Sequence, residues 1–285
     1  MKTEDEIRKK VREGYAQVAK GSSSCCAPQN TCCAPQASCC AAADLATEVS
    51  KKIGYSSEEL GSVPDGANLG LGCGNPVALA SLKEGEVVLD LGSGAGFDCF
   101  LAANKVGPKG KVIGVDMTPE MIEKARENAS RGGYRNVEFR LGEIENLPVA
   151  DNQADVIISN CVINLSPDKE RVFKEAFRVL KPGGRLMVSD IVLVSQLPDS
   201  VKNSVAAYIG CISGAEMKDG YIKAIKAAGF QQVSVLDEAA FPADYMSNDP
   251  TAQALINESG IPSSDLKQLG KAIRSAKVYA VRPKR

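Results

Sequence analysis

A glycine-rich turn between an apolar run and a helix-like segment most constrains how this chain can fold. The stretch Asp90-Leu-Gly-Ser-Gly-Ala-Gly96 follows the apolar residues 87–91 and precedes residues 97–106. Glycines suit a strand-to-helix turn where the backbone comes close to a ligand, because a Cβ would obstruct the approach. Phe97 stands where the dinucleotide fingerprint needs its third glycine, which disfavours a nicotinamide dinucleotide. Asp116 ends the next predicted strand, where an acidic side chain can accept hydrogen bonds from ribose hydroxyls.

The segments around this turn alternate between strand-like and helix-like patterns. This alternation predicts an α/β fold, a Rossmann-like doubly wound sheet of about seven strands with a late antiparallel edge strand. The predicted strands are residues 87–91, 111–116, 137–141, 154–159, 185–190, 232–236 and 276–281. The predicted helices are residues 3–20, 43–60, 97–106, 119–131, 169–180 and 221–228, with weaker helical character between 240 and 275.

The composition excludes several classes of function. The chain has 285 residues, a formal net charge of −1 and no histidine. The charge gives no general attraction to nucleic acid or to an anionic membrane. No stretch approaches the ~18 apolar residues that span a bilayer, and the acidic start is no secretory signal, so a cytoplasmic location is expected. The lack of histidine excludes serine–histidine triads and histidine general bases.

Six of the ten cysteines are concentrated in one short segment near the N-terminus. Three adjacent pairs, Cys25-Cys26, Cys32-Cys33 and Cys39-Cys40, lie in residues 21–42, where prolines prevent a continuous helix. We interpret this segment as flexible and rich in reduced thiols, within an N-terminal region of residues 1–60. The main domain is predicted at 61–240. Residues 241–285 are predicted to add a helical insert and the last edge strand.

The motifs around the glycine turn resemble those of class I S-adenosylmethionine methyltransferases, over roughly residues 83–193. The resemblance implies a donor site in which Asp116 holds the ribose and Met117 lies near the adenine. It also implies an acidic and an apolar side chain after the third strand, where Glu143 and Ile144 are the candidates. The full set of cofactor-binding candidates is Asp90, Gly92, Gly94, Gly96, Asp116, Met117, Glu143, Ile144 and Asn160.

Three further cysteines are placed to face that donor site. Cys161 directly follows the fourth strand, and Cys73 and Cys211 lie in loops that could reach the same edge of the sheet. Three thiolates suit a soft, three-coordinate ion such as trivalent arsenic, whose lone pair can attack a sulfonium methyl group. Such an acceptor needs no general base, unlike an oxygen acceptor.

Four motifs together resemble the arsenite methyltransferase family: Gly72-Cys-Gly-Asn-Pro76, Asp90–Asp98, Gly114–Thr118 and Ser159-Asn-Cys-Val-Ile-Asn-Leu165. The resemblance implies that Cys73, Cys161 and Cys211 bind arsenic and act in catalysis. It implies arsenite or its thiol complexes as substrate, for detoxification. We expect glutathione or thioredoxin as thiol reductant and a monomeric chain.

Other interpretations of the same residues remain open. Cys99, on the helix predicted after the glycine turn, is interpreted as a small buried residue of the core. The paired cysteines fit a tail without catalytic need as well as arsenic capture, and a zinc or copper site is a third choice. The rival activity is a quinone-type C- or O-methyltransferase, and the non-enzymatic alternative is a thiol sensor or metal store.

Overall fold

The computed structural model describes residues 3–21, 41–197, 214–240 and 271–284 of the chain. Cys211, the paired cysteines and most of the predicted helical insert therefore lie outside the described residues. Before the sheet come α1 (Glu4–Gly21), α2 (Ala41–Lys52), α3 (Ser57–Gly61) and α4 (Pro76–Leu79). The strands are β1 (Val87–Leu91), β2 (Lys111–Asp116), β3 (Val137–Leu141), β4 (Ala154–Asn160), β5 (Leu180–Leu193), β6 (Gln231–Ala240) and β7 (Ile273–Val281). Between them lie α5 (Phe97–Val106), α6 (Pro119–Arg131), the 3₁₀ turn η1 (Ile163–Leu165), α7 (Lys169–Val179) and α10 (Lys218–Ala227).

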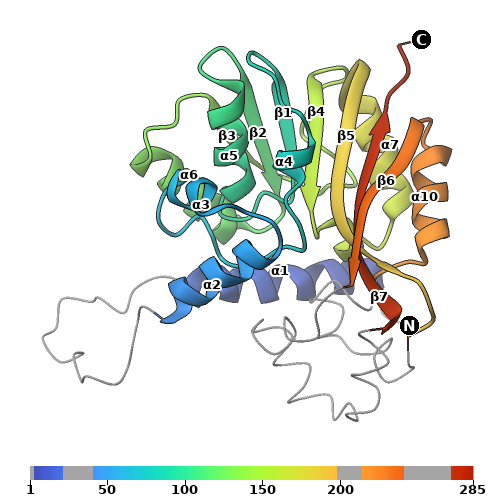
Figure 1. Ribbon diagram of the computed structural model, residues 1–285, viewed down its shortest axis with the longest axis horizontal. Coiled ribbons are helices and arrows are strands. Elements are labelled where there is room, and N and C mark those ends of the chain that lie inside the picture. Colours follow the sequence, from blue (N-terminus) through green and yellow to red (C-terminus); the bar gives the residue numbers. More distant parts are fainter. Residues whose placement is uncertain (1–2, 22–40, 198–213, 241–270, 285) are drawn as a thin grey trace, which may run out of the picture.

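The seven strands form one sheet in the order β3-β2-β1-β4-β5-β7-β6. The first five strands in that order pair in parallel, whereas β7 pairs antiparallel with both β5 and β6 (Figure 1). The expected antiparallel strand lies at this end of the sheet, but β7 itself is inserted between β5 and the outermost strand, β6, rather than at the edge. The doubly wound α/β sheet predicted from the alternation is confirmed.

Helices cover both faces of the sheet and complete two hydrophobic cores. Buried side chains of α4, α5 and α6 pack against one face, and those of α7 and α10 pack against the other. Each strand alternates its side chains between the two faces, so Val88 and Leu89 of β1 lie in different cores. Among the described residues, no helix has both the length and the apolar character needed to cross a membrane.

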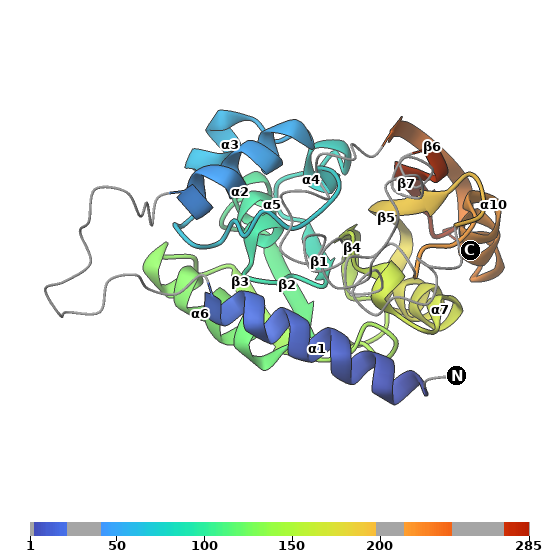
Figure 2. The ribbon, with the colours of Figure 1, turned by 90° about the horizontal axis from the view of Figure 1, so that it is seen from below.

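Helix α1 runs across the carboxyl ends of the parallel strands, as the two perpendicular views show (Figures 1 and 2). Val11 is fully buried there, and the Lys20 ammonium pairs with Glu120 of α6 at 2.9 Å. The predicted helix over 43–60 is divided into α2 and α3. Gly54 adopts a φ of 107° after α2, and the Ser56 capping box then starts α3.

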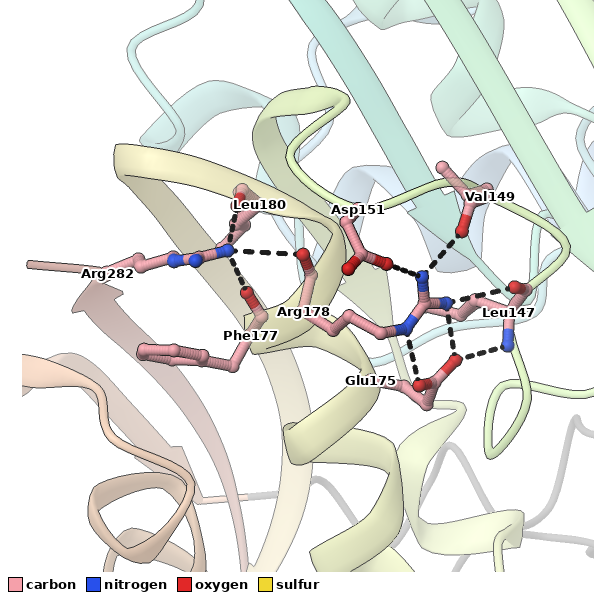
Figure 3. Close-up of polar contacts among 8 residues, drawn as sticks. All are labelled: Leu147, Val149, Asp151, Glu175, Phe177, Arg178, Leu180 and Arg282. Carbon is pink, nitrogen blue, oxygen red and sulfur yellow. Dashed lines mark hydrogen bonds and ion pairs between the residues drawn. The ribbon is translucent and has the colours of Figure 1, made fainter.

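Arg178 of α7 ties the loop after β3 to the body of the fold (Figure 3). Its guanidinium donates to the carbonyls of Leu147 and Val149 and to the carboxylate of Asp151, at 3.2, 2.9 and 2.6 Å. Glu175 accepts from the same guanidinium and from the Leu147 amide, at 2.7 and 2.8 Å. This network fixes the end of the segment that begins at Gly142 and borders the pocket described below.

Arg282 fastens the end of β7 to the junction of α7 and β5 (Figure 3). Its guanidinium donates to the carbonyls of Phe177, at 2.7 Å, and of Leu180. The same group lies 4.7 Å from the centre of the Phe177 ring, a cation–π contact. The antiparallel strand is therefore held by side-chain contacts as well as by its ladder.

Candidate active site

A pocket opens at the carboxyl ends of β1, β2 and β4, the edge where doubly wound sheets bind ligands. The space between its walls, open solvent included, is about 1010 Å³. Residues of α1, including Val11 and Tyr15, form its roof. The chain therefore builds the pocket from strand ends below and an N-terminal helix above.

The glycine turn forms the floor of this pocket. A Cβ on Gly92 would overlap the side chain of Val162, whereas a Cβ on Gly94 would project into open space in the pocket. Both glycines have positive φ, 71° and 51°. Asp116 accepts hydrogen bonds from the Gly94 and Thr118 amides at 2.9 and 2.8 Å, which joins the turn to the end of β2. The bare backbone at Gly94 leaves room for a ligand to lie against it.

Carboxyl groups give the pocket its electrostatic character. Burial raises the pKa of Asp90 well above its usual value, and it raises the pKa of Asp116 too. Burial also raises the pKa of Asp98 to about 6, against hydrogen bonds that Tyr55 and Asn160 donate to it. Desolvated carboxylates are stabilised by a nearby cation. The pocket therefore suits a ligand that carries positive charge.

The structure brings two of the three predicted cysteines together beside this pocket. The sulfurs of Cys73 and Cys161 and a carboxylate oxygen of Asp190 all lie within 4.8 Å of one another. Cys73 is 3% exposed, while Cys161 is half-buried and lines the pocket. Cys211 lies outside the described residues. The two described cysteines thus come from segments far apart in the sequence.

Asn160, at the end of β4, holds the loop that carries Cys73. Its Oδ1 accepts from the Cys73 amide at 3.0 Å, and its Nδ2 donates to the Gly74 carbonyl at 2.8 Å. The same Nδ2 reaches the Tyr55 hydroxyl at 2.9 Å and Asp98 at 3.1 Å. Asn160 lines the pocket as predicted, but its amide is engaged mainly in fixing the cysteine loop.

The glycines on either side of Cys73 are required by close packing. A Cβ on Gly72 would lie 2.9 Å from the Asn160 amide nitrogen, and one on Gly74 would overlap the Ser189 hydroxyl. Ser275 of β7 donates to the Cys73 carbonyl at 2.6 Å, and the Cys73 thiol donates to the Ser189 carbonyl at 3.4 Å. The thiol is therefore positioned from both sides by the fold.

Cys161 adopts a φ of 60°, a left-handed conformation that is unusual for a side chain with a Cβ. Its amide donates to the Ser189 carbonyl at 2.8 Å, which holds the backbone in this conformation. Strained residues of this kind gather at functional sites, where the surrounding structure determines the geometry. The turn aims the residue after β4 toward the edge where Cys73 lies.

The other predicted site residues divide between the pocket wall and its surroundings. Met117 and Ile144 line the pocket. Gly96 does not; it caps α5, and a Cβ there would lie 2.8 Å from Phe100 and Phe139. Glu143 does not line it either. Glu145 lines it instead, with its carboxylate accepting from Ser166 at 2.6 Å and lying 3.5 Å from Arg8.

Several residues in or beside the pocket had no signal in the sequence that singled them out. Arg8 and Tyr15 reach the pocket only because α1 folds back over the strand ends. Asp190 and Tyr221 join the cysteines from β5 and α10, with the Tyr221 hydroxyl donating to Asp190 at 3.1 Å. Cys99, read as a core residue, is fully buried, and its thiol donates to Asp90 at 3.2 Å.

Comparisons with known proteins point to one family. A family model described as a methyltransferase domain matches residues 82–229. The arsenite methyltransferase of Halobacterium salinarum is 48% identical over 256 residues, 89% of this chain and 65% of that protein. The arsenite methyltransferase of Aquipseudomonas alcaligenes is 43% identical over 183 residues, 59% of this chain and 52% of that protein. The chain thus spans about half to two thirds of these curated relatives.

A solved structure agrees with the sequence relatives. The arsenic(III) S-adenosylmethionine methyltransferase of Chlamydomonas reinhardtii matches with a TM-score of 0.61 and 33% identity. The match covers 83% of this chain and 73% of that one. The similarity therefore extends well beyond the methyltransferase domain that the family model describes.

Proposed function

The chain belongs to the arsenite methyltransferase family of S-adenosylmethionine-dependent enzymes, and from this premise we propose that it methylates trivalent arsenic. The substrate is arsenite or its complexes with small thiols, and the product of a first cycle, methylarsenite, is the substrate of a second. The observation that most supports this is the convergence of the Cys73 and Cys161 sulfurs beside a pocket lined by carboxylates. We further propose that the reaction serves arsenic detoxification in the cytoplasm, where thiols stay reduced.

The donor occupies the pocket over the glycine turn in this proposal. Asp116, which already accepts from two backbone amides, would accept hydrogen bonds from the ribose hydroxyls with its remaining lone pairs. Asp90 and the bare backbone at Gly94 border the methionine part, and Met117 and Ile144 supply apolar contacts for the adenine. When bound, the donor supplies an electrophilic methyl carbon attached to a sulfonium.

The cysteines hold the acceptor in a geometry that suits attack. Two thiolates from fixed loops, with Cys211 as the proposed third, displace the oxygen or thiol ligands of arsenic and keep its lone pair free. Holding the arsenic at a near-attack distance of ~3–3.5 Å from the methyl carbon turns methyl transfer into an effectively unimolecular step. No base is required, which agrees with a chain that contains no histidine.

Apolar side chains surround the Cys73 sulfur. Val11 of α1 and Leu165 of η1 belong to the same hydrophobic cluster as Cys73. A bound sulfonium donor would lose its positive charge on methyl transfer, and these apolar side chains would favour that change. Arsenic that has given its lone pair to carbon must then regain two electrons. Oxidation of two thiols to a disulfide supplies them, and glutathione or thioredoxin is the proposed external source.

The two methylations place different demands on the cysteines. A methylated arsenic has one valence fewer for sulfur, so two thiolates suffice for the second cycle, and we assign Cys161 and Cys211 to it. The test is arsenic speciation after incubation of the purified chain with arsenite, thiol and labelled methyl donor. Cys161→Ser is expected to abolish both products, whereas Cys73→Ser should still convert methylarsenite. Cys99→Ser is the matched control. Equal loss of both steps in Cys73→Ser would contradict the division of roles, and an inactive wild-type chain would contradict the function.

A further inference from the structure

Asp190 lies beside the sulfurs of Cys73 and Cys161, but the proposed arsenic site does not require it. Its carboxylate oxygen lies within 4.8 Å of both sulfurs, yet trivalent arsenic bound by thiolates needs no carboxylate. Asp190 is fully buried on β5. Two sulfurs and one carboxylate oxygen are instead the donor set of a borderline or soft divalent cation.

We propose that Cys73, Cys161 and Asp190 form a binding site for a thiophilic divalent cation of the zinc and cadmium class, which arsenite and the cation occupy in turn. Arsenite and the cation would bind the same two sulfurs, so binding of one excludes binding of the other. The competition rests on the proposed function; the cation site itself does not.

The spacing of the donor atoms suits such a cation. Tetrahedral zinc with bonds of ~2.3 Å places two sulfurs about 3.8 Å apart. The three donor atoms already lie within 4.8 Å of one another, so small side-chain rotations close the site. A larger soft cation such as cadmium needs still less movement. Solvent or a further ligand completes the coordination from the pocket, which Cys161 borders.

Hydrogen bonds orient the carboxylate of Asp190 as they orient carboxylates that ligate metals. Oδ1 accepts from the Asn164 amide at 2.8 Å and from the Ile191 backbone amide at 2.9 Å. Oδ2 accepts from the Tyr221 hydroxyl at 3.1 Å. Partners of this kind fix ligand orientation and strengthen metal binding. The lone pairs they leave free are available to a cation.

The charge balance also favours a dication. Two thiolates and a carboxylate together carry three negative charges, of which a dication leaves one. Lys169, at the start of α7, is buried and acts electrostatically on Asp190. It therefore offsets the remaining charge at a desolvated site, which would otherwise be costly.

The experiment uses the full-length chain with its six paired cysteines replaced by serine, because those thiols would bind the same probes. Cadmium chloride is titrated into the reduced protein, and the ultraviolet sulfur-to-metal charge-transfer absorption is followed. Phenylarsine oxide, which binds vicinal thiols, is the second probe. The variants are Asp190→Asn, Tyr221→Phe, Cys73→Ser and Cys161→Ser, with Cys99→Ser as the control. Methyl-donor binding measured by calorimetry reports whether each variant is folded.

We expect Cys73→Ser and Cys161→Ser to lose binding of both probes, and Cys99→Ser to keep both. Asp190→Asn should weaken cadmium binding by at least about tenfold, while phenylarsine oxide binding stays unchanged. Removing a hydrogen-bond partner of a metal ligand already lowers metal affinity by about tenfold or more, and removing the ligand itself should lower it at least as much. Tyr221→Phe should weaken cadmium binding by a smaller factor. Cadmium should also reduce phenylarsine oxide binding competitively.

Two results would overturn the cation site: cadmium binding unaffected by Asp190→Asn in a variant that still binds the donor, or both probes bound at once. Failure of phenylarsine oxide to bind at all, with cadmium binding intact, would instead remove the arsenic function and leave the cation site standing.

Discussion

A single amide side chain couples the two sulfur-bearing segments. Asn160 precedes Cys161 in the sequence and holds the backbone on both sides of the Cys73 peptide. Sequence reasoning placed Asn160 beside the methyl donor, and the structure adds that its hydrogen bonds set the position of the other cysteine. Because its four hydrogen-bond partners all belong to buried residues, truncation leaves several donors and acceptors unpaired.

Asn160→Ala is therefore expected to weaken phenylarsine oxide binding by about tenfold or more, equivalent to ~1.4 kcal/mol, because the Cys73 loop loses its anchor. Donor binding should fall less, since the glycine turn and Asp116 are unchanged. The exposed Asn146, at the loop after β3, offers a matched control as Asn146→Ala. Arsenical affinity unchanged in Asn160→Ala would refute the anchoring role.

Substitutions at two glycines of the turn distinguish a packing role from a ligand-binding role. Gly92→Ala places a methyl group into Val162, so it should lower both thermal stability and donor affinity. Gly94→Ala meets nothing in the protein and extends into the pocket. Gly94→Ala should therefore lower the free energy of unfolding by only ~1–2 kcal/mol, the energy of placing alanine in the left-handed conformation. Donor binding, by contrast, should be lost. Melting curves and donor calorimetry on both variants check this. Intact donor binding in Gly94→Ala would contradict the position of the donor.

Asp98 gives the stability of the ligand-free chain a defined pH dependence. Burial raises its pKa from 3.8 to about 6, so between these values the folded state holds more protons than the unfolded state. Stability must therefore fall as pH rises through this window, by up to about 3 kcal/mol from this group. Urea unfolding from pH 4 to 7 should show the decline, and Asp98→Asn should flatten it. An unchanged slope in the variant would show that other groups are responsible.

At the scale of elements, α7 supports the pocket through Arg178. This side chain holds the loop that ends the pocket-lining segment 142–148 by bonds to two carbonyls and two carboxylates. The hydrogen bonds from Arg178 to the buried carbonyls should supply most of its contribution to stability, because exposed ion pairs contribute little.

Arg178→Met is expected to lower the free energy of unfolding by about 1–3 kcal/mol and to increase amide exchange in residues 144–151. Arg171, exposed on the same helix, gives the control Arg171→Met, for which we expect a change within ~0.5 kcal/mol. Equal exchange rates in the two variants would mean that the loop is held by its own packing.

Local sequence patterns predict these elements well where apolar runs are bounded by glycine or proline. Strands β1, β2 and β3 and helices α5 and α6 begin and end at the predicted residues. Strand β5 is longer than predicted, since its ladders with β4 and β7 continue past the expected ends at 185 and 190. Pairing partners decide such ends, and a single strand carries no information about its neighbours.

At the scale of the whole molecule, the site could be predicted only where residues lie near strand ends. Motif position was enough to predict Asp90, Asp116 and Cys161 at one edge of the sheet. It could not reveal Tyr55, Asp190 or Arg8, because their contacts to the site depend on how distant helices and strands pack. The tyrosine hydroxyl, for example, reaches Asp98 across 43 residues of sequence at 2.6 Å.

In the proposed enzyme, cysteines from separate loops hold arsenic beside the methyl donor. X-ray absorption at the arsenic edge, on the chain without its paired cysteines and without added thiol, measures this most directly. We predict an all-sulfur first shell in the parent chain, with oxygen replacing one sulfur in Cys73→Ser and in Cys161→Ser but not in Cys99→Ser. An arsenic shell of oxygen alone in the parent chain, or a sulfur shell that neither substitution changes, would contradict the account.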